Sequence, residues 1–127
     1  MTQFVDIAKL EIEILDLFFK EKGLSFKVDS WPELAIRERN YSGKGLLTEF
    51  EPSETLNLRC TDCDERWTNA VGVINGDIDI GFLVYVDAGR VTAVEVFTYG
   101  GENWPDSIRD FEIHHIEVTH IPPKGDD

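Results

Sequence analysis

The fold is decided by residues 81–99, which read Gly81-Phe82-Leu83-Val84-Tyr85-Val86, Asp87-Ala88-Gly89-Arg90 and Val91-Thr92-Ala93-Val94-Glu95-Val96-Phe97-Thr98-Tyr99. Two runs of β-branched and aromatic residues flank a short turn that contains Asp and Gly, which predicts a β-hairpin. Isoleucine alternates with aspartate over residues 77–80. We therefore expect the first strand to begin before residue 81.

A second hairpin is predicted upstream, where residues 34–41 and 46–51 flank Ser42-Gly43-Lys44-Gly45. The two glycines suit a tight turn between antiparallel strands. Residues 24–29 alternate like a half-buried strand, with a loop before Pro32 as the alternative. Further strands are predicted at residues 56–58 and 111–119, with a polar loop at residues 61–65.

An amphipathic helix is predicted over residues 3–22, where polar side chains recur at steps of three and four. Thr2 is the expected N-cap, and Gly23 is expected to end the helix. The wide apolar face indicates a helix that packs on a sheet. We therefore predict an α+β fold, with an N-terminal helix packed on a mostly antiparallel twisted sheet of six to eight strands. A single domain is expected over residues 1–121, followed by a frayed acidic tail at residues 122–127.

The composition is ordinary for a globular domain except in its charge. The 127 residues hold 12 Lys and Arg against 25 Asp and Glu, a net charge of −13. A chain this acidic is a poor nucleic-acid binder, whereas it is attracted to basic proteins. No apolar run has the length of a membrane span, and the first residues lack the basic segment of a signal peptide. We therefore expect a cytoplasmic protein that binds neither membrane nor nucleic acid.

The two cysteines form an isolated Cys60-Thr61-Asp62-Cys63 motif. A zinc site would need a second pair of ligands from His114, His115 or His120. His114 and His115 are neighbours on a predicted strand and should point to opposite faces. A thioredoxin-like role lacks the surrounding βαβ unit. We therefore favour two reduced cysteines in a loop, with no metal and no cofactor.

Two further residues have both a catalytic and a structural interpretation. Glu95 lies on a predicted strand among apolar residues, where a carboxyl group can act as a general acid. Its structural alternative is an ion pair with Arg37 or Arg39. His115 is more often a core histidine than a ligand. No nucleophile or phosphate-binding motif accompanies them, so no catalytic residue is assigned and no enzyme is expected.

Two segments resemble a widespread family of small bacterial proteins. Residues 37–52 read RERNYSGKGLLTEFEP and resemble the family pattern R-x-Y-T-G-x-G-F-F-T-x-F-x-x-P. Residues 81–105 contain GFLVYVDAGR, VEVFTYG and WP, and resemble G-F-L-L-x-x-x-x-G-R, L-E-G-Y-T-Y-G and W-P in the same order. Val96 departs from the pattern, which has glycine there. The resemblance implies no catalytic residues. Some small acidic members resemble immunity proteins encoded beside polymorphic or contact-dependent toxins.

Charge and resemblance together give the working hypothesis of an immunity-type protein that neutralises a toxin domain. Charge complementarity favours a nuclease, whose phosphate-binding cleft is basic. The candidate contact residues are Asp62, Asp64, Glu65 and Trp67, with Asp77 and Asp79, and a second patch of Glu102, Trp104 and Asp106. The tryptophans have an equally good interpretation as plugs at the ends of a β-structure. The alternatives are an intracellular domain that binds a small ligand or a non-toxin protein, and a small metal-dependent hydrolase.

Overall fold

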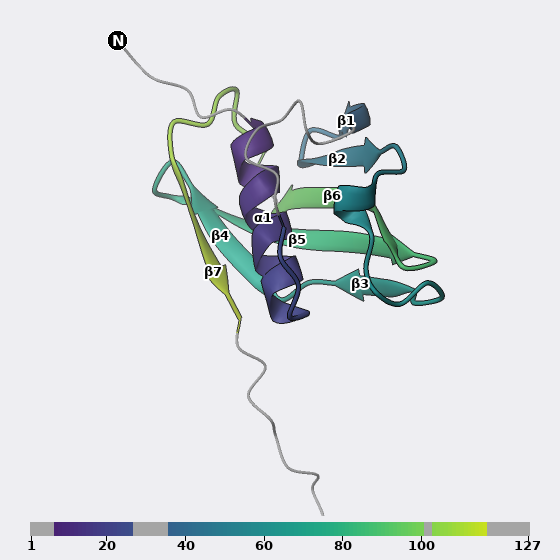
Figure 1. Ribbon diagram of the computed structural model, residues 1–127. Helices are drawn as coiled ribbons and strands as arrows, with labels where there is room; N and C mark the ends of the chain where they lie inside the picture. Colours follow the sequence, from purple (N-terminus) through teal and green to yellow (C-terminus); the bar gives the residue numbers. More distant parts are fainter. Residues whose placement is uncertain (1–6, 27–35, 101–102, 117–127) are drawn as a thin grey trace, which may run out of the picture.

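The computed structural model describes residues 7–26, 36–100 and 103–116. The elements are α1 (Ile7–Glu21), β1 (Ile36–Tyr41), β2 (Gly45–Phe50), the 3₁₀ turn η2 (Glu54–Leu56), β3 (Glu65–Trp67), β4 (Ala70–Ile74), β5 (Ile78–Asp87), β6 (Arg90–Thr98) and β7 (Phe111–His115). The α+β fold is confirmed, with one helix packed on a seven-stranded antiparallel sheet (Figure 1). The predicted N-cap, Thr2, lies outside the described residues.

The sheet is built around the predicted hairpin of β5 and β6. The strand order is β1-β2-β6-β5-β4-β7, and β3 also pairs with β5. β4 pairs with residues 78–81 of β5, whereas β3 pairs with residues 84–86, so the two short strands share one edge of the long one. The predicted hairpin of β1 and β2 is confirmed and adds to β6.

The hydrophobic core lies between α1 and one face of the sheet. Fully buried side chains include Leu10, Ile14, Leu15 and Phe18 of α1 and Ile80, Phe82, Val84 and Val86 of β5. Each contributes about 1.5–3 kcal/mol to folding through the apolar surface it removes from water. Gly23 ends the helix with a φ of +75°, and the Leu24 N–H donates to the Phe19 carbonyl. That left-handed conformation favours glycine.

Two of the strand interpretations are wrong, and over residues 24–26 the alternative of a loop is confirmed. Residues 24–26 form no strand, and Phe26 instead stacks on Phe19 at a ring distance of 5.2 Å; residues 27–29 lie outside the described part. At residues 56–58, Leu56 ends the 3₁₀ turn, and Asn57 makes only an isolated bridge to Arg90. In both places apolar side chains fill gaps at the edge of the core, which alternation alone does not distinguish from a strand.

β3 and β4 were not predicted. β4 joins β5 through a tight turn at Asn75 and Gly76, both with positive φ (55° and 81°). Three residues, 75–77, connect the strands, and Asn-Gly is a favoured sequence where two successive turn residues need positive φ. The Asn75 side chain also accepts from the Arg109 N–H at 2.7 Å and donates to the Ser107 carbonyl at 3.0 Å. The turn thus fixes the loop that leads into β7.

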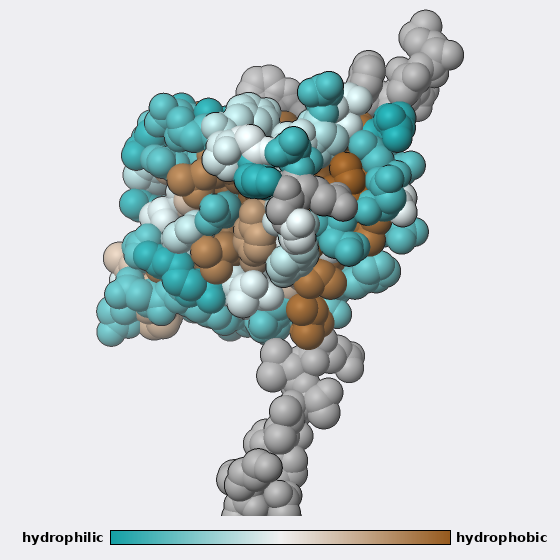
Figure 2. Space-filling model, turned by 180° about the vertical axis from the view of Figure 1, so that it is seen from behind, coloured by the Kyte–Doolittle hydropathy of each residue, from teal (hydrophilic) through white to brown (hydrophobic). Residues whose placement is uncertain are grey.

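The two faces of the sheet differ in what covers them. α1 lies across one face (Figure 1), and no described helix or strand packs on the other, called the open face below. Seen from behind (Figure 2), hydrophobic side chains gather over the middle strands and hydrophilic ones surround them. Leu47, Leu83 and Phe97 belong to this face and are half-buried by their neighbours.

Candidate functional site

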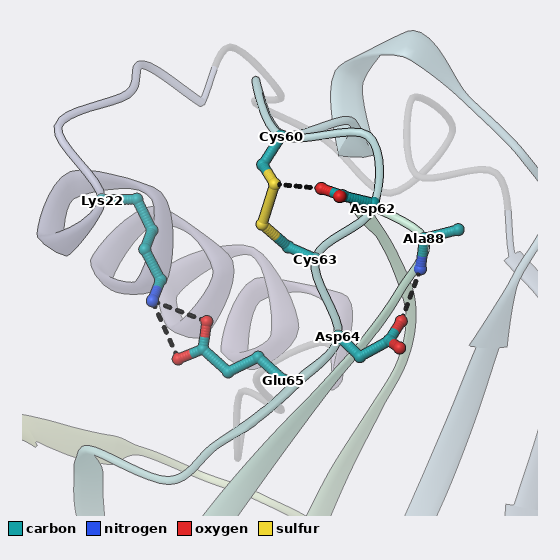
Figure 3. Close-up of a disulfide and its surroundings, with 7 residues drawn as sticks. All are labelled: Lys22, Cys60, Asp62, Cys63, Asp64, Glu65 and Ala88. Atoms are coloured by element: carbon teal, nitrogen blue, oxygen red, sulfur yellow. Dashed lines mark hydrogen bonds and ion pairs between the residues drawn. A yellow bond between two sulfur atoms is a disulfide. The ribbon is translucent and has the colours of Figure 1, made fainter.

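The polar loop at residues 57–64 holds the tip of the β5–β6 hairpin (Figure 3). The Gly89 N–H donates to the Cys63 carbonyl at 2.8 Å, and the Leu58 N–H donates to the Gly89 carbonyl at 2.7 Å. The Ala88 N–H donates to the Asp64 carboxylate at 2.8 Å. These bonds satisfy the backbone of the turn and give the loop a defined position on the sheet.

Cys60 and Cys63 form a disulfide, so the prediction of two reduced cysteines is wrong for this structure. The loop turns back tightly enough to place their Cα atoms 5.6 Å apart, within bridging range. An Asp62 carboxylate oxygen lies 2.9 Å from the Cys60 sulfur. Both sulfur atoms are engaged in the bond. Metal binding or thiol chemistry at this motif would therefore require reduction first.

The predicted acidic patch around the loop is only partly exposed. Asp62 and Asp64 are exposed, and neither forms an ion pair with a described residue. Glu65, the first residue of β3, is half-buried and pairs at 2.6 Å with Lys22, which directly follows α1. Trp67 is only 2% exposed and packs against Phe18. The proposed role of Trp67 as a contact residue does not fit this burial, since its side chain lies in the core.

Asp77 and Asp79 do not join that patch. They lie at the start of β5, whereas the 57–64 loop meets the far end of the same strand. The Tyr99 N–H donates to the Asp79 carbonyl at 3.0 Å, which places the pair beside the segment that follows β6. The predicted patch is therefore two separate clusters at opposite ends of the sheet.

The second predicted patch lies at the same end as Asp77 and Asp79. Trp104 and Asp106 line a groove of about 610 Å³, together with Tyr41, which is 63% exposed. The Trp104 N–H donates to the Gly43 carbonyl at 2.8 Å and so fixes this segment on the β1–β2 turn. Glu102 lies outside the described residues.

Glu21, at the C-terminal end of α1, joins the helix to the sheet. Its carboxylate accepts from Trp67 Nε1 at 2.6 Å and Asn69 Nδ2 at 3.0 Å, and lies 2.9 Å from His115 Nε2. His115 therefore has a structural partner, but it is exposed, so its interpretation as a core histidine is wrong. The register places His114 and His115 opposite consecutive residues of β4, so the prediction of opposite faces is confirmed.

Replacing Glu21 with glutamine is expected to make stability less sensitive to acid. Burial of the carboxyl group raises the pKa of Glu21, but hydrogen bonds from its three partners together lower it below the ordinary 4.5. The ionised form thus stabilises the fold, and this contribution is lost as the pH falls through the lowered value. Urea unfolding should show E21Q less stable than the wild type at pH 7, with the difference closing well below pH 4.5.

A suitable control is Glu13→Gln, on an exposed position of the same helix. Its stability should follow that of the wild type across the same pH range. A constant gap between E21Q and the wild type from pH 7 to pH 3 would contradict the assignment.

Glu95 has a different partner from the one predicted. It accepts a hydrogen bond from the Tyr85 hydroxyl at 2.8 Å, and the Arg66 guanidinium stacks on the Tyr85 ring at 4.7 Å. Burial and the Glu95 hydrogen bond raise the pKa of Tyr85. Arg37 instead pairs with Glu51 at 3.0 Å, and Arg39 pairs with Glu11.

Sequence reasoning missed the ion pair beneath the first hairpin. Glu11 belongs to α1 and has a side chain only 1% exposed, where it accepts hydrogen bonds from Arg39 and from the Thr48 hydroxyl. The only signal in the sequence was a glutamate within the apolar stripe of the helix. Such a group is retained only if it is paired.

None of the described helices has the length and hydrophobicity that a membrane span requires. Comparison with family models, with curated proteins and with solved structures found no match for this chain.

Proposed function

We propose that this protein is an immunity-type binding protein that acts in the cytoplasm and neutralises a bacterial toxin domain. In this proposal it covers the basic site of the toxin with an acidic surface. A nuclease is the toxin class whose site chemistry fits best, because a phosphate-binding cleft is lined by cations that carboxylates can engage in place of phosphate.

The observation that carries the proposal is the placement of the carboxylates. Asp62, Asp64, Asp77, Asp79 and Asp106 are all exposed, and none forms an ion pair with a described residue. Three of them have a fixed backbone or side chain: backbone hydrogen bonds hold Asp77 and Asp79, and the Asp64 carboxylate accepts from the Ala88 N–H. Carboxylates held in fixed positions lose little entropy when a partner binds.

The acidic groups with shifted pKa values have structural partners, which favours binding over catalysis. Hydrogen bonds from Thr92 and Arg66 lower the pKa of Asp87, against the effect of burial. A hydrogen bond from Arg37 lowers the pKa of Glu51. Each group is thus held in its ionised form within a surface network. A general acid at neutral pH needs the opposite shift.

Co-expression with the product of the adjacent reading frame tests the proposal. The protein is expected to restore growth to cells that produce the toxin, and the two chains should purify together as a stable complex. Failure to protect against any adjacent toxin, with the protein soluble and folded, would refute the proposed function.

Neutralising the loop is expected to slow association with the toxin. The double variant Asp62→Asn/Asp64→Asn removes two charges, and an asparagine at 64 still provides an acceptor for the Ala88 N–H. We expect an association rate about tenfold lower at low salt and a weaker dependence on salt, because steering acts over about a Debye length. Surface plasmon resonance across a salt series measures both quantities.

The control for this variant removes two exposed charges elsewhere, at Glu13 and Glu54. It should change the association rate less than the loop variant does. Equal effects of the two variants would show that the loop has no special part in the encounter.

The groove beside Trp104 favours a second candidate function, the binding of a small ligand. Its lining combines aromatic and apolar side chains with two polar residues, Asp106 and Ser107, the usual composition of ligand sites. Thermal shift measurements with a panel of metabolites test this function. A ligand-induced rise in melting temperature that Trp104→Ala abolishes would support it.

A further inference from the structure

The open face of the sheet has an apolar centre that no described helix or strand covers. Leu47 of β2 and Leu83 of β5 lie directly across from Glu95 of β6 on its two sides. Ala93 and Phe97 continue this strip along β6, two residues before and after Glu95. The open face is the side of the molecule seen in Figure 2. Ala93 is itself buried, whereas Leu47, Leu83 and Phe97 keep part of their surface exposed. A partly exposed apolar patch surrounded by polar residues marks an interaction surface.

A shallow hollow of about 270 Å³ lies next to this strip. Leu47 and Ala93 form apolar parts of its lining. Its polar lining includes Glu49 and Tyr85 and also Arg37 and Arg90. A hollow of this size has room for one large side chain of a partner. Interfaces commonly concentrate their affinity in such a central pocket.

Glu95 gives the centre of the face a specific polar group. Its Oε1 accepts the hydrogen bond from the Tyr85 hydroxyl, and the Arg66 guanidinium lies over the Tyr85 ring. Its Oε2 accepts no hydrogen bond from a described residue. A half-buried carboxylate between two leucines is thus held in place with one acceptor oxygen available. Such a carboxylate forms strong hydrogen bonds with an arginine or lysine.

The charges around the centre indicate what kind of partner fits. Glu38 and Glu49 lie directly opposite each other on β1 and β2, a like-charge pair that weakens an isolated sheet. Two further carboxylates lie on either side of Val73 of β4: Asp79 of β5 and Glu112 of β7. Arg37 lies in the same region but donates to Glu51. Arg66, across from Tyr85, pairs with Asp87, and Arg90 borders the hollow. Carboxylates still outnumber these cations, so the rim as a whole is acidic.

We propose that the open face, centred on Glu95, Leu47 and Leu83, is the surface that binds the basic site of the toxin domain. A cation of the toxin donates to Glu95, and an apolar side chain enters the hollow. This inference rests on the proposed function and adds the surface that carries it out. A second copy of this chain is a poor occupant, because two acidic rims would repel each other.

Binding of the purified toxin domain tests the surface, with the toxin inactivated in its own active site and taken from the adjacent reading frame. Glu95→Gln keeps an acceptor for Tyr85 and removes the charge. It is expected to weaken binding about 30-fold or more, mainly through faster dissociation. Leu83→Ala is expected to weaken binding about tenfold. Circular dichroism melts confirm that each variant is folded.

Glu13→Gln is the matched control, since it makes the same change on an exposed position of α1. It should alter the affinity less than about twofold. If the wild type binds and inhibits the toxin while both open-face variants keep wild-type affinity, the surface is wrong and the proposed function stands. If the wild type does not bind the toxin, both fail. A dimer in sedimentation experiments that Leu83→Ala dissociates would also overturn the surface, because a second copy would then occupy it.

Discussion

Replacing Arg39 with methionine is expected to lower the free energy of unfolding by about 3 kcal/mol. The substitution leaves the Glu11 carboxylate, which is 1% exposed, with only the Thr48 hydroxyl as a described partner. A buried charge that loses its counterion costs far more than the pair contributes when it is intact. Urea unfolding at pH 7, analysed with a common slope, measures the change.

Arg37→Met is the natural control, because Arg37 is also an arginine of β1 that pairs with a glutamate, Glu51, but on the exposed surface. It should change stability little, since solvent screens exposed pairs. The triple replacement of Glu11 by leucine, Arg39 by methionine and Thr48 by valine should recover most of the loss. Equal destabilisation by R39M and R37M would contradict the burial of this pair.

Replacing Gly89 with alanine is expected to destabilise the protein by about 3 kcal/mol. Gly89 has a φ of +75°, and a Cβ atom there would overlap the backbone carbonyl of Cys60. Alanine therefore strains its own backbone and also pushes the 57–64 loop away from the hairpin. Thermal and urea unfolding measure the loss.

Gly76→Ala separates the two causes. Gly76 has a similar φ of +81° at the tip of the other turn of β5, but nothing lies within 4 Å of its added Cβ. Its substitution should cost only about 1 kcal/mol of backbone strain. Equal losses for the two alanine variants would show that the contact between loop and hairpin contributes nothing.

The strongest local patterns predicted the fold correctly, because their residues specify structure without help from distant contacts. The alternation and the turn at residues 81–99 produced the central hairpin, and the period of the helix was as expected. β4 was missed, although its Asn75-Gly76 turn carries a strong hairpin signal. β3 is only three residues long and depends on pairing with β5, which no local pattern encodes.

The candidate site was less predictable, because exposure and proximity are decided by tertiary packing. Asp62 and Asp64 lie in a polar loop, and their exposure followed from that. Trp67 is of a residue type that is common at binding interfaces, yet its side chain is buried beneath the helix. Asp77 is near the loop in sequence and far from it in the sheet, since the whole of β5 lies between them.

The central position of β5 also determines which parts of the sheet depend on the others. β6 pairs along one edge of β5, and β4 and β3 share the other edge. β1 and β7 each pair with a single neighbour at the margins. The margins can therefore open by local fluctuation while the middle of the sheet persists. A ligand bound to the middle strands would therefore contact the part of the sheet that is the last to unfold locally.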